Sequence, residues 1–189
     1  MKTIRQALGA LSFFVLATAL YTALVTLVGA AAFPAGSGGS IITVDGEARG
    51  SRLLGQDFSD PGYFRGRPSA SGYDPLSGAG SNLGPSSAAL AKLIADRRAA
   101  LVSENGGAEP LADLLSASSS GLDPDISPAA ARYQAARIVK ARGLGPSGAA
   151  DIEDAIERLT KGRTLGFMGE PRINVVELNR VLDTRFPRR

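Results

Sequence analysis

The feature that most constrains this chain is a long uncharged stretch near its start. Residues 6–44 carry no charged side chain, and residues 7–32 are almost wholly apolar. As a helix, these roughly 26 residues would extend about 39 Å at 1.5 Å per residue, enough to cross a bilayer with some tilt. A helix satisfies its own backbone hydrogen bonds, which lipid demands. The sequence therefore predicts one transmembrane helix at 7–32 that tethers everything after it.

A cleaved signal peptide is the competing interpretation of this stretch. Lys2 and Arg5 form a short positive front, and Ala30–Ala32 resembles a small-residue cleavage site. The apolar core of a signal peptide, however, is only about 7–15 residues long. Length therefore favours a retained membrane anchor over a cleaved leader.

Charge on the two sides of the helix predicts its orientation. Lys2 and Arg5 lie just before the apolar stretch, whereas Arg49 and Arg52 are the first basic residues after it. The positive-inside tendency then places the short N-terminus, residues 1–6, in the cytoplasm and the rest of the chain outside it.

After the anchor, the sequence predicts a linker and one domain. Residues 33–44 begin with the Gly- and Ser-rich run FPAGSGGS, which is typical of a flexible linker. Residues 45–189 are numerous enough for one domain with its own core. Helical periodicity and short β-type runs both occur in this part, so we expect an α+β fold. Helices are expected at 87–102, 128–142, 149–160 and from 174 onward, and a strand at 42–44. Residues 111–118 could form a strand or a short helix, and the strand is favoured.

Helix boundaries have clear signals at three places. Ser127 followed by Pro128 is a favourable N-cap and first helical residue, and Gly143 is a suitable C-terminal stop. Asn174 with Glu177 three residues later predicts a capped start for the last helix.

Composition excludes several kinds of chemistry. The chain has no Cys and no His, so disulfides and imidazole-based catalysis are excluded, and no metal site is predicted. Without Lys2 and Arg5, the 21 basic residues fall to 19 against 18 acidic ones. The domain is therefore nearly neutral, and nothing predicts nucleic-acid binding.

A serine run keeps one catalytic alternative open. Ser118–Ser120 precede a glycine, and a serine nucleophile without His would need a lysine as its base. None of the domain's lysines stands in an S-x-x-K arrangement with these serines. Folding can still bring such a pair together, so a membrane-anchored extracytoplasmic serine hydrolase is the alternative function. The simpler interpretation is a turn stabilised by hydroxyl-to-backbone hydrogen bonds.

Two parts of the sequence predict contact with partner chains. Thr18, Thr22 and Thr26 recur every four residues and share one face of the anchor, where they would dock other transmembrane helices or simply bond to their own preceding turns. Residues 55–86 are rich in Gly, Pro and Ser but carry four aromatic rings, which predicts an ordered, irregular loop that is held down by ring packing and exposed for contact. From this loop and the turn at 118–128, we expect partner contact by Tyr63, Phe64, Arg67, Asn82 and Asp123.

The helix at 128–142 carries an unusual polar face. Gln134 lies one turn before Arg137, so an amide could meet a ribose or base while the guanidinium meets phosphate. Spacing alone equally describes a solvated basic face with a neutral glutamine on it.

A series of segments occurs in a distinctive order along the chain: LLGQDF (53–58), YFRGRPS (63–69), SGAGSNLGPS (77–86), SASSSGLDPDISP (116–128), ARYQAARIVKARGL (131–144) and GFMGEPRINVVELNRVLD (166–183). Within them, SNLGPS, SGLDPDISP and GEPRINV are specific in combination. This order resembles one family, KdpC, the C subunit of the Kdp high-affinity potassium-transporting ATPase.

The resemblance implies a non-catalytic accessory subunit of a bacterial inner-membrane complex. Its partners would be an ATP-hydrolysing P-type subunit, a channel-like potassium-binding subunit and a small membrane peptide. Such a subunit stabilises the complex and acts as a catalytic chaperone that raises the ATP affinity of its partner. It has no cofactor of its own, and any ATP is shared with the ATPase subunit. The resemblance assigns ATP contact to Gln134, with Arg137 beside it. That role conflicts with an extracytoplasmic domain, because ATP is scarce there.

Overall fold

A computed structural model describes residues 2–44 and 46–187 of the chain. The chain divides into two compact units between Ser51 and Arg52. This boundary lies downstream of the predicted domain start at residue 45, which falls outside the described residues, as does the predicted end at residue 189.

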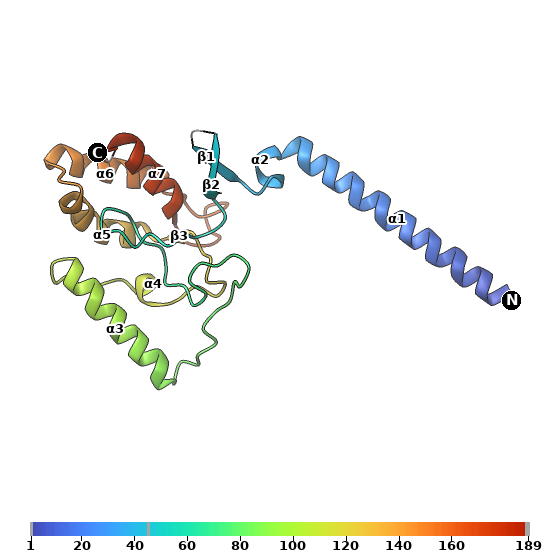
Figure 1. Ribbon diagram of the computed structural model, residues 1–189, viewed down its shortest axis with the longest axis horizontal. Helices are drawn as coiled ribbons and strands as arrows, with labels where there is room; N and C mark the ends of the chain where they lie inside the picture. Colours follow the sequence, from blue (N-terminus) through green and yellow to red (C-terminus); the bar gives the residue numbers. More distant parts are fainter. Residues whose placement is uncertain (1, 45, 188–189) are drawn as a thin grey trace. The chain divides into compact units, whose positions relative to one another are not determined.

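The first unit is dominated by one continuous helix. α1 runs from Lys2 to Ala32, contains 31 residues, and buries none of them within the protein (Figure 1). It includes the whole predicted span at 7–32 and, in the part of the chain that is described, is the helix long and apolar enough to cross a membrane. A helix that exposes apolar side chains along its whole length is stabilised by lipid, because contact of those side chains with water is unfavourable.

The segment after α1 is more ordered than a flexible linker. α2 (Pro34–Ser37) forms one helical turn, and β1 (Ile41–Val44) pairs antiparallel with β2 (Glu47–Ser51). The Ser51 hydroxyl donates a hydrogen bond to the Gly39 carbonyl oxygen at 2.6 Å and closes this small hairpin unit. The prediction of a strand at 42–44 is confirmed, but the flexible linker predicted at 33–44 is corrected to a turn and a strand.

The second unit has the mixed composition expected of an α+β domain. Its helices are α3 (Ala88–Glu104), α4 (Ala112–Leu115), α5 (Pro128–Ala141), α6 (Pro146–Leu159) and α7 (Val175–Arg185). Two short strands, β3 (Asp125–Ile126) and β4 (Ile173–Asn174), pair antiparallel beside them. Apolar faces of α5, α6 and α7 form the core with β3 and β4, and its largest aliphatic members are Ile138, Ile152, Ile156, Ile173, Leu178 and Leu182.

The predicted helix signals act as expected. The Ser127 hydroxyl accepts a hydrogen bond from the Ala130 N–H at 3.0 Å, and Asn174 Oδ1 accepts one from the Glu177 N–H at 3.0 Å. Gly143 ends α5 with a positive φ of 64°. These local bonds satisfy N–H groups that have no partner inside the helix, which is why short sequence patterns identify them.

One element was predicted with the wrong type. The strand expected at 111–118 is instead the helical turn α4, which buries Leu114 in the core. The Asp113 carboxylate accepts a hydrogen bond from the Ser127 N–H at 2.9 Å. This tertiary contact stabilises the turn and overrides the local β preference of the segment.

The long loop at 55–86 packs its backbone directly against the turn at 116–123. The Gly55 N–H donates to the Leu122 carbonyl oxygen at 2.8 Å. A Cβ placed on Gly55 would lie 2.8 Å from the Asp123 carbonyl oxygen, and one on Gly80 would lie 2.9 Å from the Ser119 carbonyl oxygen. Side chains do not fit in these contacts, so Gly55 and Gly80 serve close backbone packing.

Gly121 gives a test of this packing. It has a φ of +70°, and a Cβ there would lie 2.9 Å from the Ala79 carbonyl oxygen and 2.6 Å from the Ser71 hydroxyl. We expect Gly121→Ala to lower the free energy of unfolding by about 2–4 kcal/mol. Gly143→Ala is the matched control, because Gly143 also has positive φ but open space around its Cα. It should cost only about 1 kcal/mol.

Denaturant unfolding of the full-length chain in detergent measures both values. Equal losses in the two variants would contradict the packing of the loop against the turn.

Candidate functional site

Two buried amide side chains hold the centre of the long loop. Asn179 on α7 accepts from the Phe64 N–H and donates to the Phe64 carbonyl oxygen, both at 2.8 Å. Gln134 on α5 accepts from the Arg65 N–H at 2.9 Å and donates to the Arg65 carbonyl oxygen at 3.1 Å. Each amide thus gives a residue of the loop the pair of bonds that a neighbouring strand would give. We call Asn179 and Gln134 the amide clamp.

The amide clamp is inaccessible to solvent. Gln134 is 1% exposed and Asn179 is 2% exposed. An unmade hydrogen bond is expensive at such depth, and pairing each amide with a backbone N–H and C=O avoids that cost. The clamp therefore fixes the conformation of residues 63–65 with little freedom to slide.

Arginines extend the clamp toward the start of the loop. Arg137 donates to Gln134 Oε1 at 2.9 Å, to the Tyr63 carbonyl oxygen at 3.1 Å, and to the Pro61 carbonyl oxygen. Burial, aided by the nearby positive charge of Arg65, lowers the pKa of Arg137. An arginine nevertheless keeps its proton, because its ordinary pKa lies so high. The charged guanidinium of Arg137 is thus bonded to carbonyl oxygens of the loop.

Arg142 joins the loop to the end of α7. Its guanidinium, 3% exposed, lies 2.8 Å from Asp183 and 4.8 Å from the centre of the Tyr63 ring. The same side chain donates to the Gly62 carbonyl oxygen at 2.7 Å and the Phe186 carbonyl oxygen at 2.9 Å. The Tyr63 hydroxyl donates to the other Asp183 oxygen at 2.9 Å. Tyr63 is thereby stacked and hydrogen-bonded in one orientation.

The second half of the predicted contact surface is held by an ion pair. Arg67 lies 3.1 Å from Asp123, so two residues expected to contact partners bind each other. The Tyr73 hydroxyl donates to the Arg67 carbonyl oxygen at 2.5 Å. Burial, together with the negative charges of Asp57 and Asp123, raises the pKa of Tyr73 to about 12. The loop and the 116–123 turn therefore form one continuous surface.

The predicted contact residues differ in exposure. Phe64 is completely buried in the core, which corrects the expectation of an exposed ring: its backbone is held by Asn179, and its side chain fills the core. Tyr63, Arg67 and Asp123 are partly exposed on the surface, and Asn82 is exposed with a positive φ of 52°. Partner contact by these residues stays a prediction.

In the threonine stripe of α1, one hydroxyl bonds to the preceding turn of its own helix. The Thr22 hydroxyl donates to the Thr18 carbonyl oxygen at 2.8 Å, one turn earlier. A shallow hollow on the helix is lined by Phe14, Val15, Thr18 and Ala19. Docking of other helices on Thr18, Thr22 and Thr26 stays a prediction, with this hollow as its most concrete feature.

The serine run has the geometry of a turn. Ser118 is buried, and its N–H donates to the Pro68 carbonyl oxygen at 3.2 Å. The Ser120 hydroxyl accepts from the Leu122 N–H at 3.1 Å. Lys92 and Lys161 pair instead with Asp96 and Glu177, at 2.6 and 3.7 Å. These contacts match the simpler interpretation of hydroxyl-to-backbone bonds.

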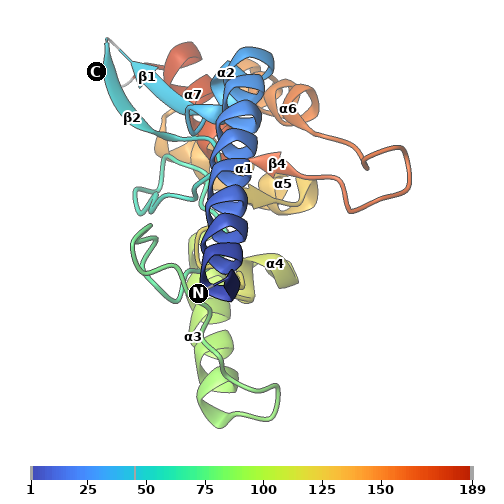
Figure 2. The same cartoon turned by 90° about the vertical axis from the view of Figure 1, so that its right-hand side faces the viewer.

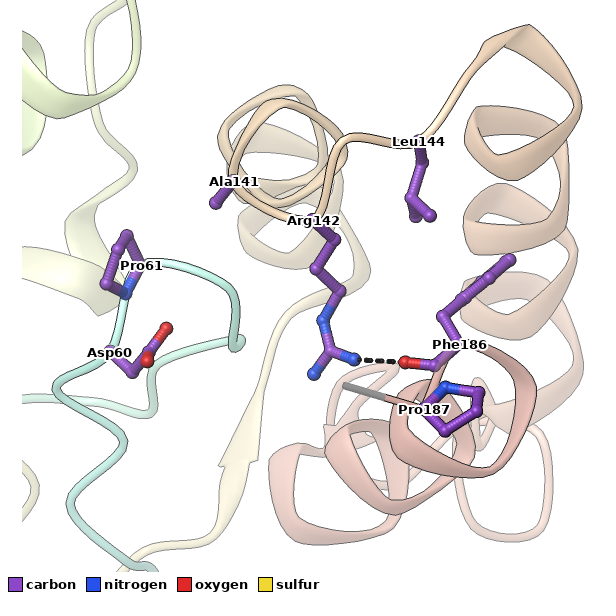
Figure 3. Close-up of a pocket in the computed structure, with 7 residues that line it drawn as sticks. All are labelled: Asp60, Pro61, Ala141, Arg142, Leu144, Phe186 and Pro187. Atoms are coloured by element: carbon purple, nitrogen blue, oxygen red, sulfur yellow. Dashed lines mark hydrogen bonds between the residues drawn. The ribbon is translucent and has the colours of Figure 1, made fainter. Parts of the chain in front are cut away.

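Two hollows lie beside the loop at 55–86. Figure 3 shows the larger one, about 650 Å³, where the end of α5 with Arg142 faces Asp60, Pro61 and the chain after α7 at Phe186. A smaller hollow of about 230 Å³ is lined partly by Gln134, Tyr73, Arg65 and Arg97. It is smaller than typical small-molecule sites, which run from about 300 Å³ upward. The Gln134 amide is already bonded to backbone there, so a nucleotide would have to displace those bonds.

Asn179, Arg142 and Asp183 are site residues that sequence reasoning missed. Asn179 follows Val175 by four residues and therefore lies on the apolar stripe of α7. A polar residue on a buried stripe is the available signal, since it must find hydrogen-bond partners. Arg142 and Asp183 carry no such signal, because charged residues at helix ends usually face solvent.

Together, these features define an α+β domain that follows a helix long enough to span a membrane, and whose buried Gln134, Arg137 and Asn179 side chains hold its own backbone. Comparison with known proteins gives the family. The sequence model described as "KdpC: K+-transporting ATPase, c chain" matches residues 4–184, and the chain belongs to this family.

Curated relatives agree with this membership. A chain from Methylococcus capsulatus is 48% identical over 86% of this chain and 87% of its own length. One from Caulobacter vibrioides is 45% identical over 99% and 95%, and one from Herpetosiphon aurantiacus is 45% identical over 95% and 94%. Each is named a potassium-transporting ATPase KdpC subunit.

Asn179→Ala tests the amide clamp. The change leaves the N–H and C=O of Phe64 without partners in the core, so we expect unfolding to become easier by about 2–4 kcal/mol. Arg180→Ala, at the exposed neighbouring position on α7, should change stability by less than about 0.5 kcal/mol. Thermal unfolding of the full-length chain in detergent compares the two, and a mild effect of Asn179→Ala would refute the clamp.

Tyr73 predicts a loss of stability in alkali. The pKa of the Tyr73 hydroxyl is about 12 in the folded protein and 10.0 in the unfolded chain, so the folded state holds this proton more tightly. The resulting stabilisation is fully present below pH 10 and disappears as the pH rises through 12. Absorbance titration of tyrosinate should show a last ionisation step near pH 12, and this step should be lost in Tyr73→Phe. A Tyr133→Phe control should retain it, and a wild-type titration complete by pH 11 would contradict the burial of Tyr73.

Proposed function

We propose that this chain is a non-catalytic accessory subunit of an ATP-driven potassium uptake complex. The observation that carries the proposal is the single family match across residues 4–184, which includes both α1 and the domain. A match over the anchor and the domain together supports a function that uses both. The partners in this proposal are an ATP-hydrolysing P-type subunit, a channel-like potassium-binding subunit and a small membrane peptide.

In this proposal α1 stays in the bilayer and the domain lies outside the cytoplasm. Lys2 and Arg5 are at the start of α1, and its last turn has no basic residue. That asymmetry supports a cytoplasmic N-terminus. The domain then meets its partners at the outer face of the inner membrane.

The domain contributes shape in place of chemistry. The amide clamp, Arg137 and Arg142 fix the loop from several sides, and the Arg67–Asp123 pair joins it to the 116–123 turn. A surface held this way enters a complex with little loss of conformational entropy, which favours tight association. Stabilising the assembly is the function this geometry supports best.

The chaperone effect on ATP affinity follows from the same rigidity. Gln134 and Arg137 are buried and bonded to the loop backbone, so we place them as positioning residues for residues 61–65. The ATPase subunit binds ATP in the cytoplasm, and the accessory subunit raises that affinity through the assembled complex. ATP is then a ligand of the partner, and this chain needs no cofactor of its own.

Co-purification and growth at low potassium test the function. A tagged chain should bring down the other pump subunits, and its deletion should abolish growth in micromolar potassium. Gln134→Ala should weaken ATP affinity of the assembled pump while the purified chain alone binds no ATP at millimolar concentration. The proposal would be refuted if the tagged chain recovered none of the other pump subunits, or if cells grew normally in micromolar potassium after its deletion.

Sidedness is measured on the same cells. The chain has no cysteine, so Leu76→Cys introduces a single thiol at a position that is 96% exposed. A membrane-impermeant maleimide should label this thiol from outside spheroplasts. Labelling only after lysis would place the domain in the cytoplasm and reverse the topology.

A further inference from the structure

The segment between α6 and β4 is a β-hairpin that projects from the domain. Backbone hydrogen bonds join Lys161 and Arg172 in both directions, at 2.8 and 3.0 Å, and Thr164 with Met168 in both directions, at 2.9 Å. In Figure 2 this stretch, orange in colour, extends sideways from β4. Its base continues directly into β4, which is buried and precedes α7. We call residues 161–172 the apolar-tipped hairpin.

The tip of this hairpin exposes large apolar side chains to solvent. Leu165 is 80% exposed, Phe167 is 71% exposed and Met168 is 52% exposed. Other large apolar residues on the described surface of the same unit, Leu53 and Leu76 among them, are isolated in sequence. Single exposed apolar residues are ordinary, whereas a cluster of three at a protruding tip is typical of a contact surface.

The backbone of the tip is strained in a way that maintains this display. Leu165 has a φ of +53°, a conformation that a leucine rarely adopts and that an asparagine or glycine tolerates well. The Arg163–Glu170 ion pair at 2.6 Å and the Thr164–Met168 bonds close the hairpin around it. A leucine in a position suited to asparagine indicates that its side chain is used for contact.

The surroundings of the tip discriminate between possible occupants. The basic residues at the hairpin base are each paired with a carboxylate: Lys161 with Glu177, Arg163 with Glu170, and Arg172 with Asp125. Few free charges then remain for lipid phosphates, which disfavours the bilayer surface. A stable dimer buries about 800 Å² on each partner, more than three side chains supply, which disfavours a second copy. A subunit of a complex that is also held together by other contacts, as the proposed function requires, needs only a small apolar socket for this tip.

We propose that the apolar-tipped hairpin inserts Leu165, Phe167 and Met168 into an apolar socket on another subunit of the potassium pump. This inference rests on the proposed function and specifies one surface through which it operates. The contact is an anchor of a larger interface, in which a few buried apolar side chains supply most of the affinity.

A double variant separates docking from folding. Leu165→Asn relieves the backbone strain and Phe167→Ser removes the ring, so the purified variant should unfold at the wild-type temperature or above. Co-purification of the other pump subunits should fall about tenfold or more. Leu93→Ser is the control, because it removes an exposed, isolated leucine from α3, outside the loop at 55–86. Equal recovery of subunits with the double variant and the control would overturn the proposal.

A photo-crosslinker identifies the occupant. Phe167→Cys and Leu93→Cys each give the cysteine-free chain one thiol, which is labelled with a benzophenone maleimide in membranes that contain the whole pump. An adduct between position 167 and another pump subunit supports the proposal. Adducts with lipid alone, with a second copy of the chain, or at no more than the Leu93→Cys level overturn it. If the wild-type chain recovers no other subunit, the proposed function itself has failed, and that result is distinct.

Discussion

The pairing of a loop with two buried amide side chains is the interaction on which the domain depends. Residues 63–65 run between α5 and α7 without a neighbouring strand, yet Gln134 and Asn179 supply the donor and acceptor pairs that a strand would supply. Buried backbone N–H and C=O groups need hydrogen-bond partners, so the loop can enter the core only where side chains supply those partners. Because Phe64 is held there, this part of the loop belongs to the core and does not merely cover it.

The arginines of this domain bond largely to carbonyl oxygens and carboxylates of the domain itself. Arg137 and Arg142 both bond to the backbone of 61–63, and Arg67 bonds to Asp123. Such bonds fix shape, because each guanidinium has several donors in a fixed plane. This use of arginine explains how a chain without His or Cys, and with a nearly neutral domain, builds a rigid surface for a membrane complex. It also explains why a glutamine and an arginine that suggest nucleotide contact in sequence are buried in structure.

Local patterns were predicted well where the determining bonds are local. The caps at Ser127 and Asn174 and the long apolar helix α1 follow from residues within a few positions of each other. The strand expected at 111–118 was wrong because a distant Asp113–Ser127 bond decides that turn. The earlier start of α6, at Pro146 where residue 149 was expected, reflects the ease with which proline occupies a first helical turn.

The sequence by itself determined the long apolar helix, the α+β class, the family and the chemistry that is absent, because these depend on composition, periodicity and segment order. Only the tertiary structure decided that Phe64 is core, that Arg67 and Asp123 bind each other, and that Leu165, Phe167 and Met168 stand exposed at a hairpin tip. Burial and pairing depend on which distant segments meet, here loop 55–86 with α5, α7 and the 116–123 turn. Local sequence patterns do not predict those contacts, since each contact joins residues tens of positions apart.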